Sequence, residues 1–360
     1  MSRIMKPFPG RLLLCLVVPL LAAAGCATKP DSATNLPPCP YMRVARPDDE
    51  TIALQIAIRR FTPARGNGPV VWLSAASHLG DANYFASLQQ HLQTQALVLF
   101  EGVKDETEKQ DAIKTRIAAA RRAAKKKSAT ETNASAPASL QSSMAESLGL
   151  LFQLEAIDYE RSHFRNSDLS VQQIQRLMSG GGAGRPTAAR GKSVRSRDNE
   201  EGNQEFGKLL DMMDGSSVMG AVLNLGLKII GASPKLQALT RLVMIETLGQ
   251  LRGDITQMKG LPPEMKELIT VLIQERNKAV LADLKGALQQ RTPPRSISIF
   301  YGAGHMDDME RRLRQDYQYT CQEERWLTAF AVNTRQSGLG TVEQDLIHTL
   351  VKGMMDLMQP

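Results

Sequence analysis

The chain has 360 residues, of which 42% are hydrophobic and 22% are charged, a composition typical of a globular protein that excludes an intrinsically disordered chain. The formal net charge is +7, but residues 1–25 contain three basic residues and no acidic one, so the remainder carries +4. Because no basic face interleaved with aromatic residues accompanies this mild excess, we expect no nucleic-acid partner.

Residues 1–25 have the three parts of a secretory signal peptide: basic residues, an apolar run at 12–21, and small residues before Cys26. The apolar run is shorter than the roughly 20 residues that span a bilayer. Ala-Gly-Cys resembles the lipobox of bacterial lipoproteins, with Ala23 in place of the usual leucine. The resemblance implies lipidation of Cys26 and attachment to the cell envelope, and Ala27 implies the outer membrane, facing the periplasm. The alternative is an ordinary signal peptide followed by a chance cysteine.

Two cysteines remain when Cys15 is assigned to the signal peptide and Cys26 to the lipid. Pairing is the usual outcome for two thiols in an oxidising compartment, so we expect a Cys39–Cys321 disulfide. Two unpaired buried thiols are the alternative. Residues 26–40 are predicted to be a lipidated tether, because they are rich in proline and small polar residues and contain few large apolar ones.

The folded domain is predicted to begin with strands and one helix. Alternating apolar residues predict a strand at 52–58, and continuous apolar runs predict interior strands at 69–73 and 96–100. A helix is expected between the last two, at 81–93. Strand, helix and strand with short connections indicate a βαβ-type unit.

The middle of the chain is predicted to be helical, with flexible insertions at about 105–146 and 179–205. The first insertion is basic and rich in alanine, and it is predicted to be a frayed surface helix that runs into a flexible loop. A patch for nucleic acid or anionic lipid is its alternative interpretation. Helices are expected at 147–159, 168–178 and 218–230.

The last part returns to strands. We expect a long helix at 262–289, a strand at 296–300, a helix at 307–315, a strand at 326–332 and a helical tail at 336–360. The predicted fold class is therefore α/β: one domain at 41–335 with a mixed β-sheet flanked by helices. A large helical insertion separates its N- and C-terminal β-containing halves.

Two histidines occupy equivalent positions just beyond predicted strands. His78 follows the strand at 69–73, His305 follows the strand at 296–300, and Glu101 ends the strand between them. Because ligands in open α/β sheets bind beyond the carboxyl ends of strands, we expect these side chains to meet. Two imidazoles and a carboxylate are a usual ligand set for a catalytic divalent metal ion. The alternative is that each histidine is a structural residue of a turn or core.

These turns, Glu101 and the pair Arg276-Asn277 resemble the TraB/GumN/Tiki superfamily of metal-dependent hydrolases, which is related in fold to erythromycin esterase. The resemblance covers roughly 41–104 and 262–332. Gly302-Ala303-Gly304-His305 fits the family's Gly-x-x-His motif, whereas the first turn has Ala75 in place of the glycine.

The resemblance implies an envelope hydrolase that acts on peptide or amide bonds, with a peptide or protein as substrate. A divalent metal ion of unknown identity would bind His78, Glu101 and His305, or Glu101 would instead serve as general base. Arg276 would stabilise negative charge on a carbonyl oxygen, and Asn277 would orient a neighbour. Arg276 as a surface residue that bridges exposed charges is the alternative.

Further residues are assigned to the support of this site: Asp168, Tyr301, Gly302 and Gly304. The stretch that contains Gln153 and Asp168 also resembles a family segment near the site, although Asp168 is equally suited to cap a helix. The rival function is a non-catalytic lipoprotein that binds haem or a signalling peptide, with Tyr301 or a histidine as iron ligand. An inactive descendant is a third possibility.

Overall fold

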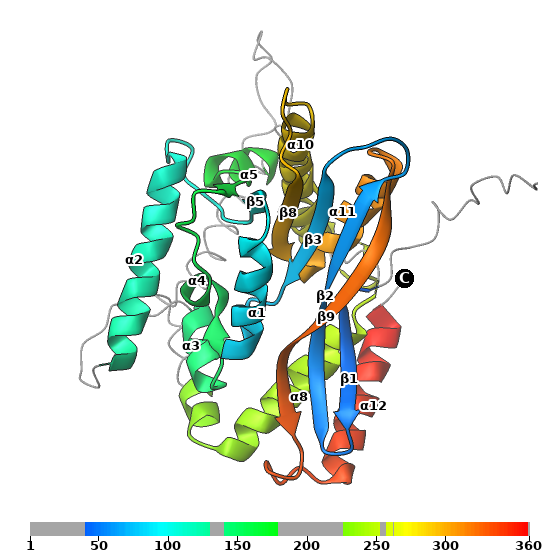
Figure 1. Cartoon of the computed structure of the whole chain (residues 1–360). Helices are drawn as coiled ribbons and strands as arrows, with labels where there is room; N and C mark the ends of the chain where they lie inside the picture. Colours follow the sequence, from blue (N-terminus) through cyan, green and yellow to red (C-terminus); the bar gives the residue numbers. More distant parts are fainter. Residues whose placement is uncertain (1–39, 130–139, 179–225, 253–256, 262, 359–360) are drawn as a thin grey trace, which may run out of the picture. The chain divides into compact units, whose positions relative to one another are not determined.

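The computed structural model describes residues 40–129, 140–178, 226–252, 257–261 and 263–358 (Figure 1). The predictions for the signal peptide, Cys26 and Cys39 lie outside these residues, as does the predicted insertion at 179–205. No helix within the described ranges combines the length and the apolar character needed to cross a bilayer.

Seven strands of the described residues form one mixed sheet in the order β1-β2-β3-β8-β5-β7, with β9 paired to the other side of β2. The strands are β1 (Met42–Asp48), β2 (Thr51–Pro63), β3 (Val70–Ala76), β5 (Leu97–Phe100), β7 (Phe164–Asn166), β8 (Ser296–Gly302) and β9 (Tyr319–Asn333). A separate short pair joins β4 (Leu79–Gly80) to β6 (Leu151–Phe152). The predicted α/β class with a mixed, helix-flanked sheet and a helical segment between two β-containing halves is confirmed.

The centre of the sheet is parallel. β8 pairs in parallel with β3 on one side and with β5 on the other, and β5 pairs in parallel with β7. β3 and β8 are buried along almost their whole length, as the continuous apolar runs predict for interior strands. All four carboxyl ends therefore reach the same edge of the sheet.

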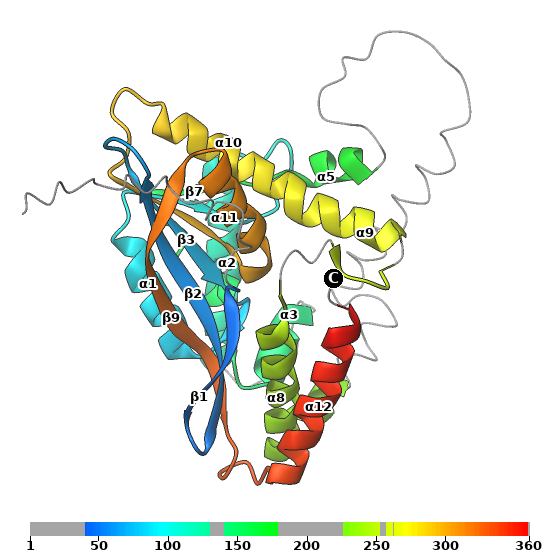
Figure 2. The same cartoon turned by 90° about the vertical axis from the view of Figure 1, so that its right-hand side faces the viewer.

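Helices cover both faces of this sheet, and Figure 2 shows α1 on one side of β3 and α10 with α11 on the other. The helices near the site are α1 (Ala82–Gln93), α4 (Gln153–Ala156), α5 (Val171–Met178), α9 (Pro263–Thr270), α10 (Arg276–Leu288) and α11 (Met306–Gln315). A π-helical turn, Val271–Glu275, joins α9 to α10. The predicted long helix at 262–289 thus contains one irregular turn.

One prediction for the middle of the chain is wrong. The expected continuous helix at 147–159 is interrupted, because Gly149 adopts a left-handed φ of 61° and the chain then pairs as β6 with β4 before the short helix α4. Within the expected insertion at 105–146, the basic, alanine-rich segment forms α2 (Gln110–Ala129), and α3 (Leu140–Ser147) begins near its end. α2 is ordered because Ile113 and Ile117 are buried in the main core.

The predicted C-terminal tail contains α12 (Thr341–Met358), which packs on α8 (Pro234–Gln250). Ile347, Val351 and Met355 are buried on its inner side. Its outer contacts with α8 are polar, since Lys235 Nζ lies 3.0 Å from Glu343 Oε1. α12 is therefore part of the same packed unit as the sheet.

Candidate functional site

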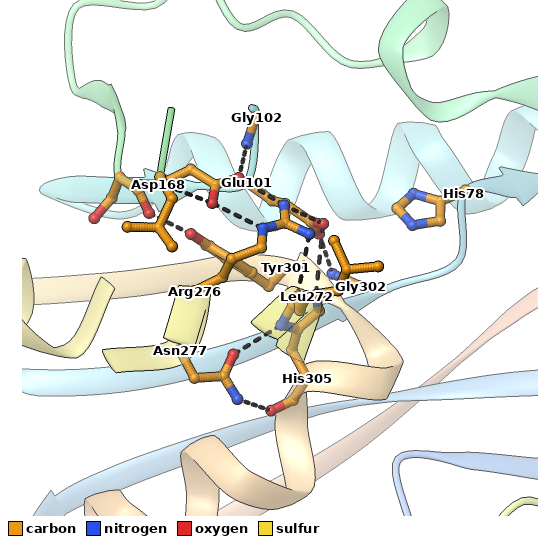
Figure 3. A network of polar contacts seen from close by, with 12 residues as sticks. His78, Glu101, Gly102, Asp168, Leu272, Arg276, Asn277, Tyr301, Gly302 and His305 are labelled. Atoms are coloured by element: carbon orange, nitrogen blue, oxygen red, sulfur yellow. Dashed lines mark hydrogen bonds and ion pairs between the residues drawn. The ribbon is translucent and has the colours of Figure 1, made fainter. Parts of the chain in front are cut away.

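The carboxyl edge of the four parallel strands carries the chemically reactive side chains (Figure 3). Glu101 directly follows β5, His78 lies two residues beyond β3, and Asp168 lies two residues beyond β7. His305 ends the 3₁₀ turn that follows β8. Arg276, the first residue of α10, extends toward them from the side.

Glu101 lies at the centre of this network. Its Oε1 accepts a hydrogen bond from Arg276 Nη2 at 2.8 Å, and its Oε2 accepts one from the Gly302 backbone amide at 2.8 Å. His305 Nε2 lies 3.6 Å from the same Oε1. Burial opposes ionisation of Glu101, but His305, Arg276, His78 and the Gly302 amide outweigh it and lower its pKa to about 2. Glu101 is thus a carboxylate at neutral pH.

Arg276 and Asp168 form a buried bidentate ion pair. Arg276 Nε donates to Asp168 Oδ1 at 2.9 Å, and Arg276 Nη2 donates to Oδ2 at 2.6 Å. Both residues are buried, so the interpretation of Arg276 as a surface residue is wrong. The π-helical turn directly before Arg276 is a type of irregularity that often occurs at functional sites.

Asp168 does not cap α5, which was its alternative role. Ser170 does, because its Oγ accepts from the Gln173 amide at 3.1 Å while Gln173 Oε1 accepts from the Ser170 amide at 2.8 Å. Asp168 instead accepts from the Gly102 amide at 2.9 Å and from Arg276. Its carboxylate thus joins the end of β5 to α10.

His305 is held by Asn277. The Asn277 amide nitrogen donates to the His305 carbonyl and to Asp308, each at 3.0 Å, so its Oδ1 faces His305 Nδ1 at 2.7 Å. Since an amide oxygen only accepts, Nδ1 carries the hydrogen and Nε2 presents its lone pair toward Glu101. Burial lowers the pKa of His305 to about 4, although Glu101 opposes this shift. His305 is therefore neutral at pH 7.

His78 is held in the same way by a second amide. Gln153 Nε2 donates to the Tyr159 hydroxyl at 2.9 Å, so Gln153 Oε1 faces His78 Nδ1 at 3.1 Å. A β-carbon built on Gly302 would lie 3.3 Å from His78 Nε2 and 3.4 Å from Glu101 Oε2. His78 Nε2 thus faces the same patch of backbone as the carboxylate, and Figure 3 shows Gly302 between His78 and Arg276. Unlike His305, His78 is exposed.

The remaining predicted residues lie around this network in different ways. Tyr301 is fully buried, and its hydroxyl donates to the Ser167 carbonyl, which removes it from the side chains available to a ligand. Gly302 leaves little room for any side chain, whereas Gly304 is exposed. Ala75 lies within β3, paired with Tyr301, and so is not part of the turn around His78.

The sequence around Gln153 contains no local pattern that indicates a role at the site. Its position depends on the pairing of β6 with β4, which brings residues 151–153 against the His78 loop. Two residues of a short extended segment give no periodic signal. Only the resemblance of its surrounding stretch pointed toward the site.

The side chains at this site could bind a cation, both because of their net charge and because of the ligand atoms they offer. Glu101 and Asp168 bring two carboxylates against the single guanidinium of Arg276, so the network has one surplus negative charge. Two imidazole nitrogens and a carboxylate are ordinary ligands of zinc and similar ions. The described residues nevertheless contain no group of three or more such side chains already gathered around one point.

No family model, no curated protein and no solved structure matches the chain. The resemblance to the TraB/GumN/Tiki superfamily therefore stays a prediction.

Proposed function

We propose that this chain is a lipid-anchored metal-dependent hydrolase of the cell envelope that acts on peptide or amide bonds. One observation carries the proposal: two imidazoles, from turns more than two hundred residues apart, have matching arrangements beside one carboxylate. In each, Nδ1 is bonded to a side-chain amide oxygen. His305 Nε2 lies 3.6 Å from Glu101 Oε1, and His78 Nε2 lies against Gly302, which Glu101 Oε2 also approaches.

The matching arrangement supports metal binding because a ligating histidine usually donates its second N–H to an oxygen acceptor. That acceptor fixes the ring orientation and the tautomer. Gln153 and Asn277 are such acceptors for His78 and His305. A structural histidine needs no particular free nitrogen, so the repetition of the pattern favours a functional role.

His78, Glu101 and His305 would hold the ion, which when bound would lower the pKa of a coordinated water to near 7. Glu101 remains ionised and is fixed by Arg276 and the Gly302 amide. Since Arg276 Nε and Nη2 are bonded to carboxylates, its role in this proposal is to hold Glu101 in place rather than to contact the substrate oxygen.

Elemental analysis of the purified full-length chain tests the proposal. We expect about one divalent ion per chain in the parent protein and in the control His348→Ala, whose histidine lies on α12. We expect His78→Ala and His305→Ala to lose the ion and to lose hydrolysis of fluorescently labelled casein. Equal metal content in all four proteins would refute the metal site.

A haem-binding lipoprotein is the second candidate, and the exposure of His78 favours it. An exposed imidazole with a free Nε2 is a suitable axial ligand for haem iron. Tyr301 is not available as the iron ligand in this candidate, because its hydroxyl is already hydrogen-bonded to the Ser167 carbonyl. Addition of haemin would then produce a Soret band in the parent protein and in His305→Ala, and none in His78→Ala.

A further inference from the structure

Asp308 is a buried carboxylate that reaches the site through one other residue. It lies in the first turn of α11, three residues after His305, and is only 4% exposed. Its Oδ2 accepts a hydrogen bond from the Asn277 amide nitrogen at 3.0 Å. The amide oxygen of Asn277 in turn lies 2.7 Å from His305 Nδ1, a contact drawn in Figure 3. These three residues form a chain, and the far ring nitrogen of the histidine lies 3.6 Å from Glu101 Oε1.

Ion pairing and the helix terminus do not explain why Asp308 is buried. Asp308 also accepts from Arg311 and, at 2.8 Å, from Arg312 Nε. The two arginine side chains lie one turn along the same helix and are 41% and 21% exposed, so they could equally pair with an exposed carboxylate. A carboxylate in the first turn of a helix likewise needs no burial to interact with the helix dipole. Asn277 is fully buried, and contact with it does require a buried carboxylate.

The carboxylate helps to determine which way round the Asn277 amide lies. The amide nitrogen contacts two oxygens that can only accept, those of the Asp308 carboxylate and the His305 carbonyl. If the amide oxygen and nitrogen exchanged places, the oxygen would face both acceptors and the nitrogen would face His305 Nδ1. The ring would then carry its hydrogen on Nε2, and that nitrogen could no longer offer a lone pair to a metal ion.

We propose that Asp308 is a positioning residue for His305: through Asn277 it holds the imidazole in the tautomer whose Nε2 is free to bind a metal ion. The inference rests on the proposed function, in which His305 is a ligand. It adds an anion behind that ligand, outside the set of residues that touch the ion. Removal of a group that orients a ligating histidine typically weakens metal binding about 10- to 100-fold.

Zinc binding by the full-length chain tests the proposal. We expect Asp308→Ala to raise the Kd for zinc about 10- to 100-fold, whereas Asp308→Asn, which keeps an oxygen acceptor at this position, should restore most of the affinity. The alanine variant should fold, because its two partly exposed arginines can turn toward solvent.

Glu310→Gln is the matched control for the loss of a buried charge. Glu310 is a second buried carboxylate of α11, but it pairs with Arg59 and Arg314 and not with Asn277. We expect this variant to bind zinc like the parent protein. Equal losses of affinity in Asp308→Ala and Glu310→Gln would overturn the proposal, because they would reflect the stability of α11 alone.

The ring of His305 gives a second readout, which needs no metal. In the metal-free chain, NMR of the ring nitrogens distinguishes a bare Nε2 from a protonated one, and the signals of His305 are assigned with His305→Ala. We expect Asp308→Ala to populate the Nε2-protonated form, which should be undetectable in the parent and in Glu310→Gln. An unchanged His305 tautomer in Asp308→Ala would overturn the role of Asp308. A parent protein that binds no zinc would refute the proposed metal site, and the ring signals alone would then decide whether Asp308 orients His305.

Discussion

At the residue scale, the central feature is a cation placed between two carboxylates in the protein interior. Arg276 is 7% exposed and Asp168 is 6% exposed, so neither charge is well solvated. The folded state tolerates these buried charges only when all three partners are present. Removal of one partner leaves an unpaired buried charge, which lowers the stability of the fold strongly. The bidentate geometry and the backbone amide of Gly102 complete the bonding of Asp168.

We expect Arg276→Met to lower the free energy of unfolding by about 3–5 kcal/mol, measured by urea denaturation with a chelator present. The methionine retains much of the volume but leaves Glu101 and Asp168 without their cation. Arg122→Met is the control, since Arg122 pairs with Glu160 on the surface, and its effect should be about 0–1 kcal/mol. Equal effects of the two substitutions would contradict the account of the buried network.

The same variant should change the acid limit of stability. The pKa of Glu101 is lowered to about 2 in the folded chain from an ordinary value of 4.5. Its ionised form therefore contributes stability above pH 4.5, and this contribution is lost as the pH falls toward 2. Without Arg276 the folded pKa rises, so the pH dependence of stability between these two values should become shallower.

The sequence predicts a side chain at the sheet edge where the residue directly follows an interior strand. His78, Glu101 and His305 follow interior strands, and the topology of parallel strands gathers such residues. Asp168 was ambiguous because the same residue type both caps helices and pairs with arginine. Its partner lies 108 residues away on α10, so no local pattern distinguishes the two roles.

At the scale of the elements, strongly apolar segments were predictable and short or charged ones were not. β3, β5 and β8 are continuous apolar runs, whereas β1 has a mostly half-buried or exposed pattern that gives no periodic signal. The first part of β9, around Cys321, consists mostly of polar residues, and the predicted strand therefore began only at residue 326. These strands form because β2 offers them hydrogen-bonding partners along both of its edges.

β9 also contains one end of the predicted Cys39–Cys321 disulfide. Cys321 is paired with Phe61 on β2, and the described chain begins at Pro40, whose carbonyl accepts from Arg59 Nη2 at 3.0 Å. Cys321 and Pro40 thus both contact β2, and Cys39 itself lies outside the described residues. We expect the mature chain to resist alkylation by iodoacetamide under denaturing conditions until reductant is added, as read by mass spectrometry. Prompt alkylation of Cys321 in the unreduced protein would exclude the disulfide.

At the scale of the whole molecule, the two β-containing halves share one sheet rather than forming two sheets. β8, from the second half, lies between β3 and β5 of the first half, and β9 pairs with β2 along 13 residues. Sequence patterns predicted the strands of both halves. They did not predict that β8 lies between β3 and β5, because strand order depends on contacts between distant segments. The position of β8 between these two strands brings His305 and Arg276 beside Glu101.

This interleaving predicts that the molecule survives a cut between its halves. The predicted loop at 179–205 contains several arginines and a lysine, so we expect trypsin to cleave it under native conditions. The two fragments should remain associated in gel filtration and separate only in denaturant, because every central strand of the sheet has a neighbour from the other fragment. The test requires reductant throughout, so that a Cys39–Cys321 bond cannot hold the fragments together. Fragments that separate without denaturant would show that the halves fold as independent units, and the residues of the proposed site would then not share one rigid sheet edge.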